Sequence, residues 1–352
     1  MMTIARGPLG GSLRAALAVC LLVLPAAGCS GGRGADSLPA LAAGDRTPAA
    51  VGAGLVEPNS VPPPGPQLYI DAADGNVYAF PLSASGVTAP SRTITPHPND
   101  VNHQSIQSIA TLADGKLAIL QNTNLSGVAR CRVVVEPANA SGPSTAQNQW
   151  CDPSAAVATY GTAIARNAAG GFDLLYENDT VFATHLNRFG ADGATLVNTM
   201  PPIAATLTFA TDNLGRDYLL SPNGEVRKYK AATTDGAVTA GDYIVAGSTF
   251  RKIAVAPDKT VYVAYGAFGS EVIVAVVNGI VTRTIGPFGK FDVSSLAVDS
   301  LGELYVGLAP LDLNTVAVLK VFGPTANGKD APLRILTPTP RLPCTCRIAI
   351  YE

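Results

Sequence analysis

Short apolar segments alternate with turn residues along the chain from residue 67 to the C-terminus. Ser295–Val298 and Glu303–Gly307 are rich in β-branched and aromatic residues, and a turn at Asp299–Gly302 separates them. This pattern predicts two β-strands joined by a tight turn. Asn-Gly and Asp-Gly dipeptides divide other apolar pairs and suit two-residue hairpin turns, because they tolerate positive φ angles. We see no long amphipathic helix after the N-terminal segment, so the predicted class is all-β.

One sequence motif recurs through this pattern at intervals of 43 to 55 residues. Each copy ends a small apolar strand in Ala, a Gly often follows five residues later, and three copies carry a Tyr eight residues later. The Ala residues are Ala110, Ala165, Ala210, Ala254, Ala297 and Ala349, and the Tyr residues are Tyr218, Tyr262 and Tyr305. Self-similarity at this step, built only of strands and turns, predicts a β-propeller of four-stranded antiparallel blades. We expect the Tyr side chains to pack between adjacent blades.

The two ends of the repeat region are complementary. The first copy opens at Gln67 without a preceding Ala strand, whereas Arg347–Tyr351 is such a strand with nothing after it. We therefore predict that the C-terminal strand completes the first blade and closes a ring of six blades, with about 48 residues per blade. Seven blades are the alternative, with a hidden blade between Ala110 and Ala165, but a long Cys-linked hairpin already fills that interval.

A second sequence motif occurs in the predicted outer strands. Phe80 is followed by Gly86, Pro90 and Arg92, and the same residue types follow Phe322 at identical spacings, as Gly328, Pro332 and Arg334. Proline suits edge strands, because it cannot donate a hydrogen bond to a neighbouring strand. We expect the outer strands of the blades to be edges, and the placement of Pro in this motif fits that position.

The segment Leu296–Val306 resembles an NHL-type repeat, and the other copies resemble degraded versions of it. Over residues 67 to 352 the chain is similar to six-bladed propellers of the NHL and SMP-30/gluconolactonase-like kind. The likeness departs from the NHL pattern at Gly307–Pro310, where an acidic and Asn-Arg continuation is usual. Calcium-dependent lactonases of related shape hold a metal with acidic and Asn residues around the central channel. The matched strand positions here carry Ala, Thr, Val and Tyr, so the resemblance implies architecture more than activity.

The N-terminus has the pattern of an export signal. Arg6 and Arg14 precede a short apolar run, and Ala26–Cys29 resembles a bacterial lipobox. The apolar run is too short to span a bilayer. We expect residues 1–28 to be a lipoprotein signal peptide that is removed, leaving a lipidated Cys29. Residues 29–66 are predicted to be a disordered tether of Ala, Gly and Pro, and residues 67–352 to be the propeller. The alternative is an ordinary signal peptide with an incidental Cys29.

The net charge limits the class of partner that we expect, and the cysteine spacing predicts disulfides. The net charge is −2, and removal of the signal makes it −4, without a basic stripe; nucleic-acid binding is therefore not expected. Cys131 and Cys151 are equidistant from Ser141, so a hairpin would place them opposite each other within disulfide range. A bond between Cys344 and Cys346 would be strained. Metal binding and redox activity are alternatives for this pair, but we favour a structural clip where the ring closes.

The best candidate for a binding loop joins the first two blades. Its polar side chains are His97, Asn99, Asp100 and His103. Two His and one Asp could act in acid–base chemistry or bind a metal. A polar turn that satisfies its own backbone is the competing interpretation and the one we favour. We predict no catalytic residues, no metal site and no cofactor, and we expect Asp212 and Asp299 to cap turns.

These observations favour a non-catalytic binding or scaffolding module. We expect a monomer held at a membrane by its lipid, in the bacterial cell envelope on the periplasmic or outer surface. Its partner would be an envelope protein, a glycan or a small ligand. The alternative function is a metal-dependent hydrolase of the SMP-30/gluconolactonase type. Three or more carboxylate or Asn oxygens converging in the central channel would favour that enzyme.

Overall fold

The computed structural model describes residues 65–96, 105–125, 128–144, 147–151, 158–178, 183–199, 203, 206–229, 243–245, 249–312, 315–342 and 344–352. Strands are the only regular elements in these ranges. None of the described residues forms a helix that is long and apolar enough to cross a membrane. The predicted signal peptide, Cys29 and nearly all of the predicted tether lie outside the described residues, as do His97, Asn99, Asp100 and His103.

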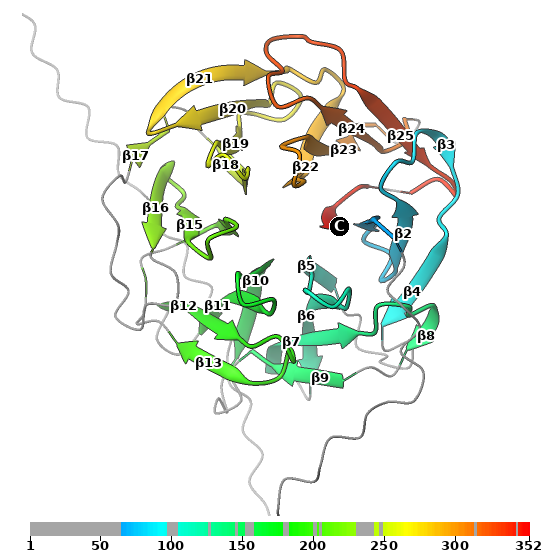
Figure 1. Ribbon diagram of the computed structural model, residues 1–352, viewed down its shortest axis with the longest axis vertical. Helices are drawn as coiled ribbons and strands as arrows, with labels where there is room; N and C mark the ends of the chain where they lie inside the picture. The colour runs from blue at the N-terminus through cyan, green and yellow to red at the C-terminus, as the bar shows by residue number, and fades with distance from the viewer. Residues whose placement is uncertain are drawn as a thin grey trace, which may run out of the picture. The chain divides into compact units, whose positions relative to one another are not determined.

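Six sheets, each with an antiparallel set of four strands, surround a central channel, which confirms the predicted six-bladed β-propeller (Figure 1). Within each blade the innermost strand is named first. Blade 1 contains β26 (Arg347–Tyr351), β1 (Gln67–Asp71), β2 (Val77–Pro81) and β4 (Arg92–Pro96). Blade 2 contains β5 (Ser105–Thr111), β6 (Leu117–Leu125), β7 (Val128–Glu136) and β9 (Gln147–Trp150). Blade 3 contains β10 (Thr159–Arg166), β11 (Phe172–Asn178), β12 (Ala183–Phe189) and β13 (Leu196–Thr199).

The second half of the ring repeats this order. Blade 4 contains β14 (Thr208–Thr211), β15 (Asp217–Leu220), β16 (Glu225–Tyr229) and β17 (Tyr243–Ile244). Blade 5 contains β18 (Phe250–Val255), β19 (Val261–Tyr265), β20 (Val272–Val277) and β21 (Ile280–Ile285). Blade 6 contains β22 (Phe291–Val298), β23 (Leu304–Pro310), β24 (Val318–Phe322) and β25 (Arg334–Pro338).

The C-terminal strand closes the ring as predicted. β26 pairs antiparallel with β1 over its whole length, from Gln67 opposite Tyr351 to Asp71 opposite Arg347. This register places Tyr69 opposite Ala349. The same Ala–Tyr pairing joins the inner two strands of blades 4, 5 and 6. Tyr69 is therefore a fourth copy of the repeated Tyr, which the interrupted first copy concealed.

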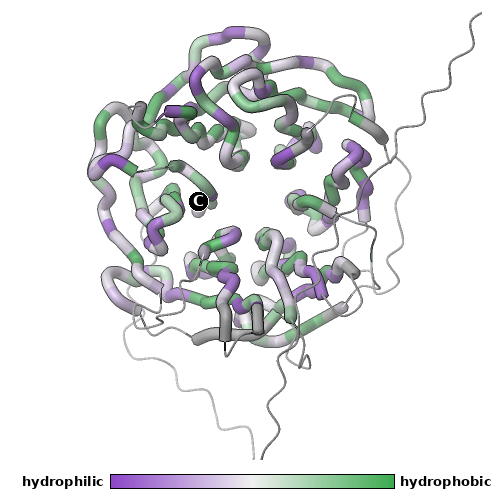
Figure 2. The backbone as a smooth tube through the Cα atoms, turned by 180° about the vertical axis from the view of Figure 1, so that it is seen from behind, coloured by the Kyte–Doolittle hydropathy of each residue, from purple (hydrophilic) through white to green (hydrophobic). Residues whose placement is uncertain are grey.

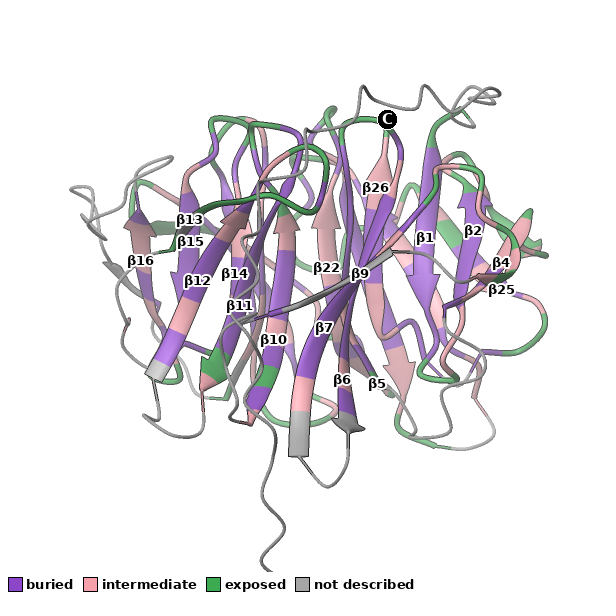
Figure 3. Ribbon diagram, turned by 90° about the horizontal axis from the view of Figure 1, so that it is seen from below, coloured by how far each residue is buried: buried purple, intermediate pink, exposed green. Residues whose placement is uncertain are grey.

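The hydrophobic core is divided among the six interfaces between adjacent blades. Each of six buried clusters joins side chains of two neighbouring blades. Apolar segments consequently occur in every blade (Figure 2), and the exposed residues gather in the connections at the two ends of the ring (Figure 3). Tyr218, Tyr262 and Tyr305 lie in the clusters that join their own blade to the next one. This confirms their predicted packing between blades.

The repeated Ala is small because the next blade approaches it closely. In five of the six interfaces it shares a core cluster with the large apolar residue that precedes the repeated Ala of the following blade. Ala110 packs with Ile164 in this way, and Ala210 packs with Ile253. A larger side chain would overfill the narrow inner end of the interface, where close packing leaves no room for added methylene groups.

The outer strands differ from the expected edge strands. β3 (Gly86–Thr88) leaves blade 1 and pairs in parallel with β25 of blade 6, and β8 (Gly142–Ser144) leaves blade 2 and pairs in parallel with β4. A third parallel bridge joins Gly328 of blade 6 to Ile285 of blade 5. We call these three segments, each together with the turn that precedes it, the straps. Each begins at or contains a Gly with positive φ, a conformation that other residues adopt at a cost. The straps cover backbone groups that a bare edge strand would leave unpaired.

An arginine secures each strap. Arg92 donates to the carbonyl oxygens of Ala138 and Ala140 at 2.8 and 3.1 Å, and to the hydroxyl of Tyr69 at 3.1 Å. Arg334 repeats the arrangement with Leu82 and Tyr305, at 2.8 and 2.9 Å. Arg283 does so with Pro324 and Tyr262. The arginine of one blade thus joins its own repeated Tyr to the strap of the next, which explains the identical spacings around Arg92 and Arg334.

Candidate functional site: the central channel

The inner strands enclose a cavity of about 480 Å³ along the axis of the ring. Residues at equivalent repeat positions form successive rings around it. The six repeated Ala residues form one ring, and the large apolar residues that precede them form the next. The ring two positions before the Ala is polar on five of six blades, and its members are Ser108, Ala163, Thr208, Lys252, Ser295 and Arg347. A band of apolar side chains therefore separates this polar ring from the other end of the cavity.

A β-bulge precedes the polar ring in four blades. The register of the inner strand shifts at Gln107 in β5, Thr162 in β10, Arg251 in β18 and Ser294 in β22. Each of these residues lies three positions before the repeated Ala. Bulges break the strict alternation of a strand and redirect side chains, often beside binding sites. Here they occur together at one level of the channel, next to Lys252 and Arg347.

The two cations of the polar ring have different surroundings. Arg347 forms an ion pair with the buried Asp71, at 3.1 Å, and its Nε donates to the carbonyl oxygen of Gln107 at 2.9 Å. The half-buried Lys252 makes no hydrogen bond or ion pair with the described residues. Burial, together with the charges of Arg347 and Arg251, lowers the pKa of Lys252 to about 8, and the charge of Glu271 opposes this shift. Arg251 itself pairs with Glu271 at 2.5 Å.

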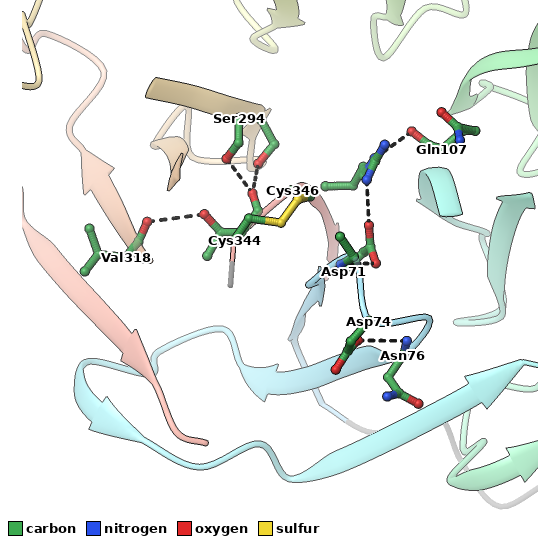
Figure 4. Close-up of a disulfide and its surroundings, with 12 residues drawn as sticks. Asp71, Asp74, Asn76, Gln107, Ser294, Val318, Cys344 and Cys346 are labelled. Carbon is green, nitrogen blue, oxygen red and sulfur yellow. Dashed lines mark hydrogen bonds and ion pairs between the residues drawn. A yellow bond between two sulfur atoms is a disulfide. The ribbon is translucent and has the colours of Figure 1, made fainter. Parts of the chain in front are cut away.

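The Cys344–Cys346 segment lies where the ring closes, beside this end of the channel (Figure 4). The structure joins the two cysteines in a disulfide, and Cys346 lines the cavity. The carbonyl oxygen of Thr345 accepts hydrogen bonds from the hydroxyls of Ser294 and Ser295, at 2.7 and 2.8 Å. The Cys346 amide donates to the backbone carbonyl oxygen of Asp71 at 2.9 Å. The segment therefore links blade 6 to blade 1 immediately before β26 begins.

The Cys131–Cys151 disulfide is confirmed, and it is remote from the channel cavity. It joins β7 to the residue after β9, with both cysteines fully buried in the interface between blades 2 and 3. The pairing of Arg132 with Trp150 shows the predicted register. However, Gly142–Ser144 is not part of a simple hairpin turn, because it leaves to form the strap on blade 1.

The buried carboxylates are engaged in structural contacts. Asp212 and Asp299 cap turns, as predicted: each accepts hydrogen bonds from two turn amides at 2.8 to 3.0 Å and one from the repeated Tyr at 3.2 Å. Burial acts to raise the pKa of Asp212, but hydrogen bonds from Arg216 outweigh it and hold the pKa below its usual value. Burial raises the pKa of Asp71 and of Glu271, each of which faces an arginine.

Two further carboxylates share one arginine. Arg188 contacts Asp173 at 2.5 Å and Asp217 at 3.0 Å, with both carboxylates buried. Burial, reinforced by the charge of Asp173, holds the pKa of Asp217 well above its ordinary value. Asp173 lies opposite Ala165, at the position that the repeated Tyr occupies in other blades. The group therefore substitutes for the Tyr–Arg pair in blade 3 and has no place in the channel cavity.

The donor set of the channel does not fit the metal site that the resemblance implies. Among the described residues, no group of three or more His, Cys, Asp or Glu could hold a metal ion. The polar ring carries Lys252 and Arg347, which would repel a cation, and at the other end of the cavity Asp212 and Glu352 accept hydrogen bonds from backbone amides. Sequence reasoning missed these two residues because it compared what the copies share. Aligning the copies on the repeated Ala and reading the position two residues earlier would have found both.

Comparison with known proteins identifies the fold but no family. No family model and no curated protein matches this sequence. A protein of unknown function from Bacteroides caccae is similar in structure, with a TM-score of 0.56 and 11% identity, over 82% of this chain and 99% of that chain. Hydrazine synthase from Kuenenia stuttgartiensis overlaps 62% of each chain at 11% identity, and its TM-score of 0.42 is too low to support any argument. The first likeness is to the propeller fold alone.

Proposed function

We propose that this protein is a non-catalytic binding module of the bacterial cell envelope, whose propeller presents one end of its channel to a ligand or partner. The observation that carries the proposal is the composition of the channel. Its walls are rings of Ala and larger apolar residues, and the polar ring at one end carries hydroxyl groups and two cations. At the other end, the carboxylates of Asp212 and Glu352 line the cavity but accept hydrogen bonds from backbone amides. Acid–base catalysis and metal-assisted hydrolysis both need carboxylate or imidazole groups aimed at a substrate. The buried carboxylates described above are instead bonded to arginines and turn amides.

Membrane anchoring through Cys29 is the second part of the proposal. It is supported by the basic start, the short apolar run and the lipobox-like Ala26–Cys29. In this proposal the propeller is an SMP-30-like or NHL-like ring on a lipoprotein signal, held near a membrane by the Ala, Gly and Pro segment that follows. Labelling with palmitate and intact-mass analysis of the full chain and of Cys29→Ala test it. A mature wild-type protein without acyl groups, or one that begins elsewhere, would contradict anchoring.

A lactone-hydrolysis assay with added calcium separates the proposed function from its alternative. We expect no hydrolysis of gluconolactone above the buffer rate, with or without the metal. Calcium-dependent hydrolysis by the purified protein would overturn the non-catalytic function. A binding role is tested by photocrosslinking in cells, with the crosslinker at Gln107, which lines the channel, and, as a control, at the exposed Lys329, next to the strap residue Gly328. A specific adduct at position 107 alone is the expected result.

A further inference from the structure

We propose that the polar ring of the channel binds a small carboxylate with a short apolar body, and that the ammonium group of Lys252 is its principal contact. The inference deepens the proposed function, since it names the ligand class of the same channel. It rests on one ion that has no counter-ion, on the cavity beside it and on the apolar residues that line this cavity.

The charges around the channel leave Lys252 uncompensated. The charged groups that face its ammonium are Arg251 on its own strand, Arg347 on β26 and Glu271 on β20. Glu271 already pairs with Arg251, and Asp71 already pairs with Arg347. One positive charge therefore remains on the polar ring. A partly desolvated ammonium without a counter-ion is unfavourable, so an anion that enters the channel would relieve this cost.

The polar ring carries other groups besides the ammonium of Lys252. Ser108 and Ser295 lie on the same ring, and their hydroxyl groups donate to the carbonyl oxygens of Ile164 and Thr345, at 3.3 and 2.8 Å. Both residues line the cavity, and the two nearby cations, Lys252 and Arg347, lie on either side of Ser295 in the order of the blades. A carboxylate between these two blades would have an ammonium and a guanidinium within the reach of charge-assisted hydrogen bonds.

The shape of the channel restricts the rest of the ligand. The cavity of about 480 Å³ lies within the range of small-molecule sites. Beside the polar ring, its lining includes the partly exposed apolar residues Ala165, Ala210 and Leu296. A short alkyl or aromatic body would bury apolar surface there, whereas a compact dianion such as phosphate would have one uncompensated charge to pair with and no use for the apolar walls. A monocarboxylate therefore fits better.

Calorimetric titration of the full chain with hexanoate tests the inference, with hexan-1-ol and inorganic phosphate as comparison ligands. We expect hexanoate to bind and the neutral alcohol to bind at least about tenfold more weakly, as expected for the loss of one ionic contact. Lys252→Met should weaken hexanoate binding by about tenfold or more, and Lys252→Arg should retain most of it. The control is Lys116→Met, which removes an exposed lysine paired with Asp114 and should change nothing.

The pH dependence gives a second readout. Binding of an anion favours protonated Lys252, whose pKa is lowered to about 8. The affinity for hexanoate should thus be flat between about pH 6 and pH 8, where the ligand is ionised, and fall by up to about tenfold per pH unit above it. In Lys252→Met this decline should disappear, and its persistence there would contradict the assignment to Lys252.

Several results would overturn the carboxylate site. They are equal affinity of wild type and Lys252→Met, equal affinity for hexanoate and hexan-1-ol, tighter binding of phosphate than of hexanoate, or a wild-type dissociation constant above about 10 mM, which is negligible affinity. A chain that binds hexanoate as expected, yet hydrolyses a lactone only with calcium, would support this site while overturning the non-catalytic function.

Discussion

The guanidinium group of Arg334 lies over the ring of Tyr305, 5.7 Å from its centroid, and donates a 2.9 Å hydrogen bond to its hydroxyl group. The same guanidinium reaches the carbonyl oxygen of Leu82, on the strap of the next blade. Glu303 completes the group by pairing with Arg334. One side chain thus joins two blades through a stacked ring, an ion pair and a strap, and equivalent contacts recur at Arg92 and Arg283.

Replacing Arg334 should therefore destabilise the ring where blade 6 meets blade 1. We expect Arg334→Ala to lower the free energy of unfolding by about 2 kcal/mol, as for the loss of hydrogen bonds to a charged group. Arg334→Lys should recover little of it, since an ammonium cannot reproduce the planar fork. Urea unfolding measures both. Arg227→Ala, which breaks a more exposed pair with Glu225, is the control and should cost about 0–1 kcal/mol. Similar losses for the two variants would contradict a role of Arg334 in joining blade 6 to blade 1.

Removal of residues 347–352 should open the ring. The deletion takes away all of β26, leaves β1 without its inner partner and breaks the Arg347–Asp71 ion pair. Both the loss of buried apolar groups and the unpaired charge of Asp71 are destabilising, so we expect a loss of several kcal/mol. Differential scanning calorimetry measures it. Deletion of Glu352 alone is the control, and an unchanged melting temperature after the longer deletion would contradict ring closure.

The repeated Ala should not tolerate enlargement. Ala210 packs against Ile253 of the next blade, so Ala210→Leu would force extra methylene groups into a closed interface. We expect a loss of about 1–3 kcal/mol, the usual cost of overpacking. Ala194→Leu, in an exposed turn, provides the comparison and should have little effect on urea unfolding. Equal effects of the two substitutions would mean that the inner ends of the blades are loosely packed.

Asp217 should make stability fall as pH rises. Its pKa in the folded protein is raised, because burial and Asp173 disfavour its charge. The folded state therefore holds a proton that the unfolded chain releases near pH 4, and the stabilisation is lost as pH rises through the folded pKa. Asp217→Asn removes this titration, so its stability relative to wild type should improve between pH 4 and pH 8.

Asp192 supplies a control of opposite sign for that experiment. Hydrogen bonds from the hydroxyl and amide of Thr195, with a further one from the Ala194 amide, hold the pKa of Asp192 below its usual value. Its contribution is present above the unfolded pKa and is lost as pH falls through the folded one. Asp192→Asn should therefore cost more stability at pH 7 than at pH 3. Parallel pH profiles for the Asp192 and Asp217 variants would contradict both assignments.

Repetition explains how much of this fold could be predicted from the sequence. Arg347–Tyr351 was identified as the closing strand with its correct bounds, because it matches the other strands that contain the repeated Ala. The straps were not predicted, since a parallel strand of three residues in another blade leaves no local periodicity. Their glycines, Gly86 and Gly328, were visible as a spacing, but the partner strands lie far away in the sequence.

The candidate site was harder to predict, because its chemistry lies in departures from the repeat. Lys252 and Arg347 occupy a position where the other blades carry Ser, Thr or Ala, and only the ring brings the two cations to the same level. Asp173 is a similar case. It replaces the repeated Tyr and recruits Arg188 from the neighbouring strand, a contact that no spacing along the chain indicates.

The pairing of β26 with β1 also determines when blade 1 can be completed during synthesis of the protein. The contact between Asp71 and Arg347 spans 276 residues, so blade 1 cannot be completed until β26 has been synthesised. Throughout synthesis β1 would present an unpaired backbone edge, a feature that promotes aggregation and that slow, non-local folding prolongs. Folding of this propeller therefore finishes after translation of its C-terminal strand, and chaperones that shield strand edges would act on it during that interval.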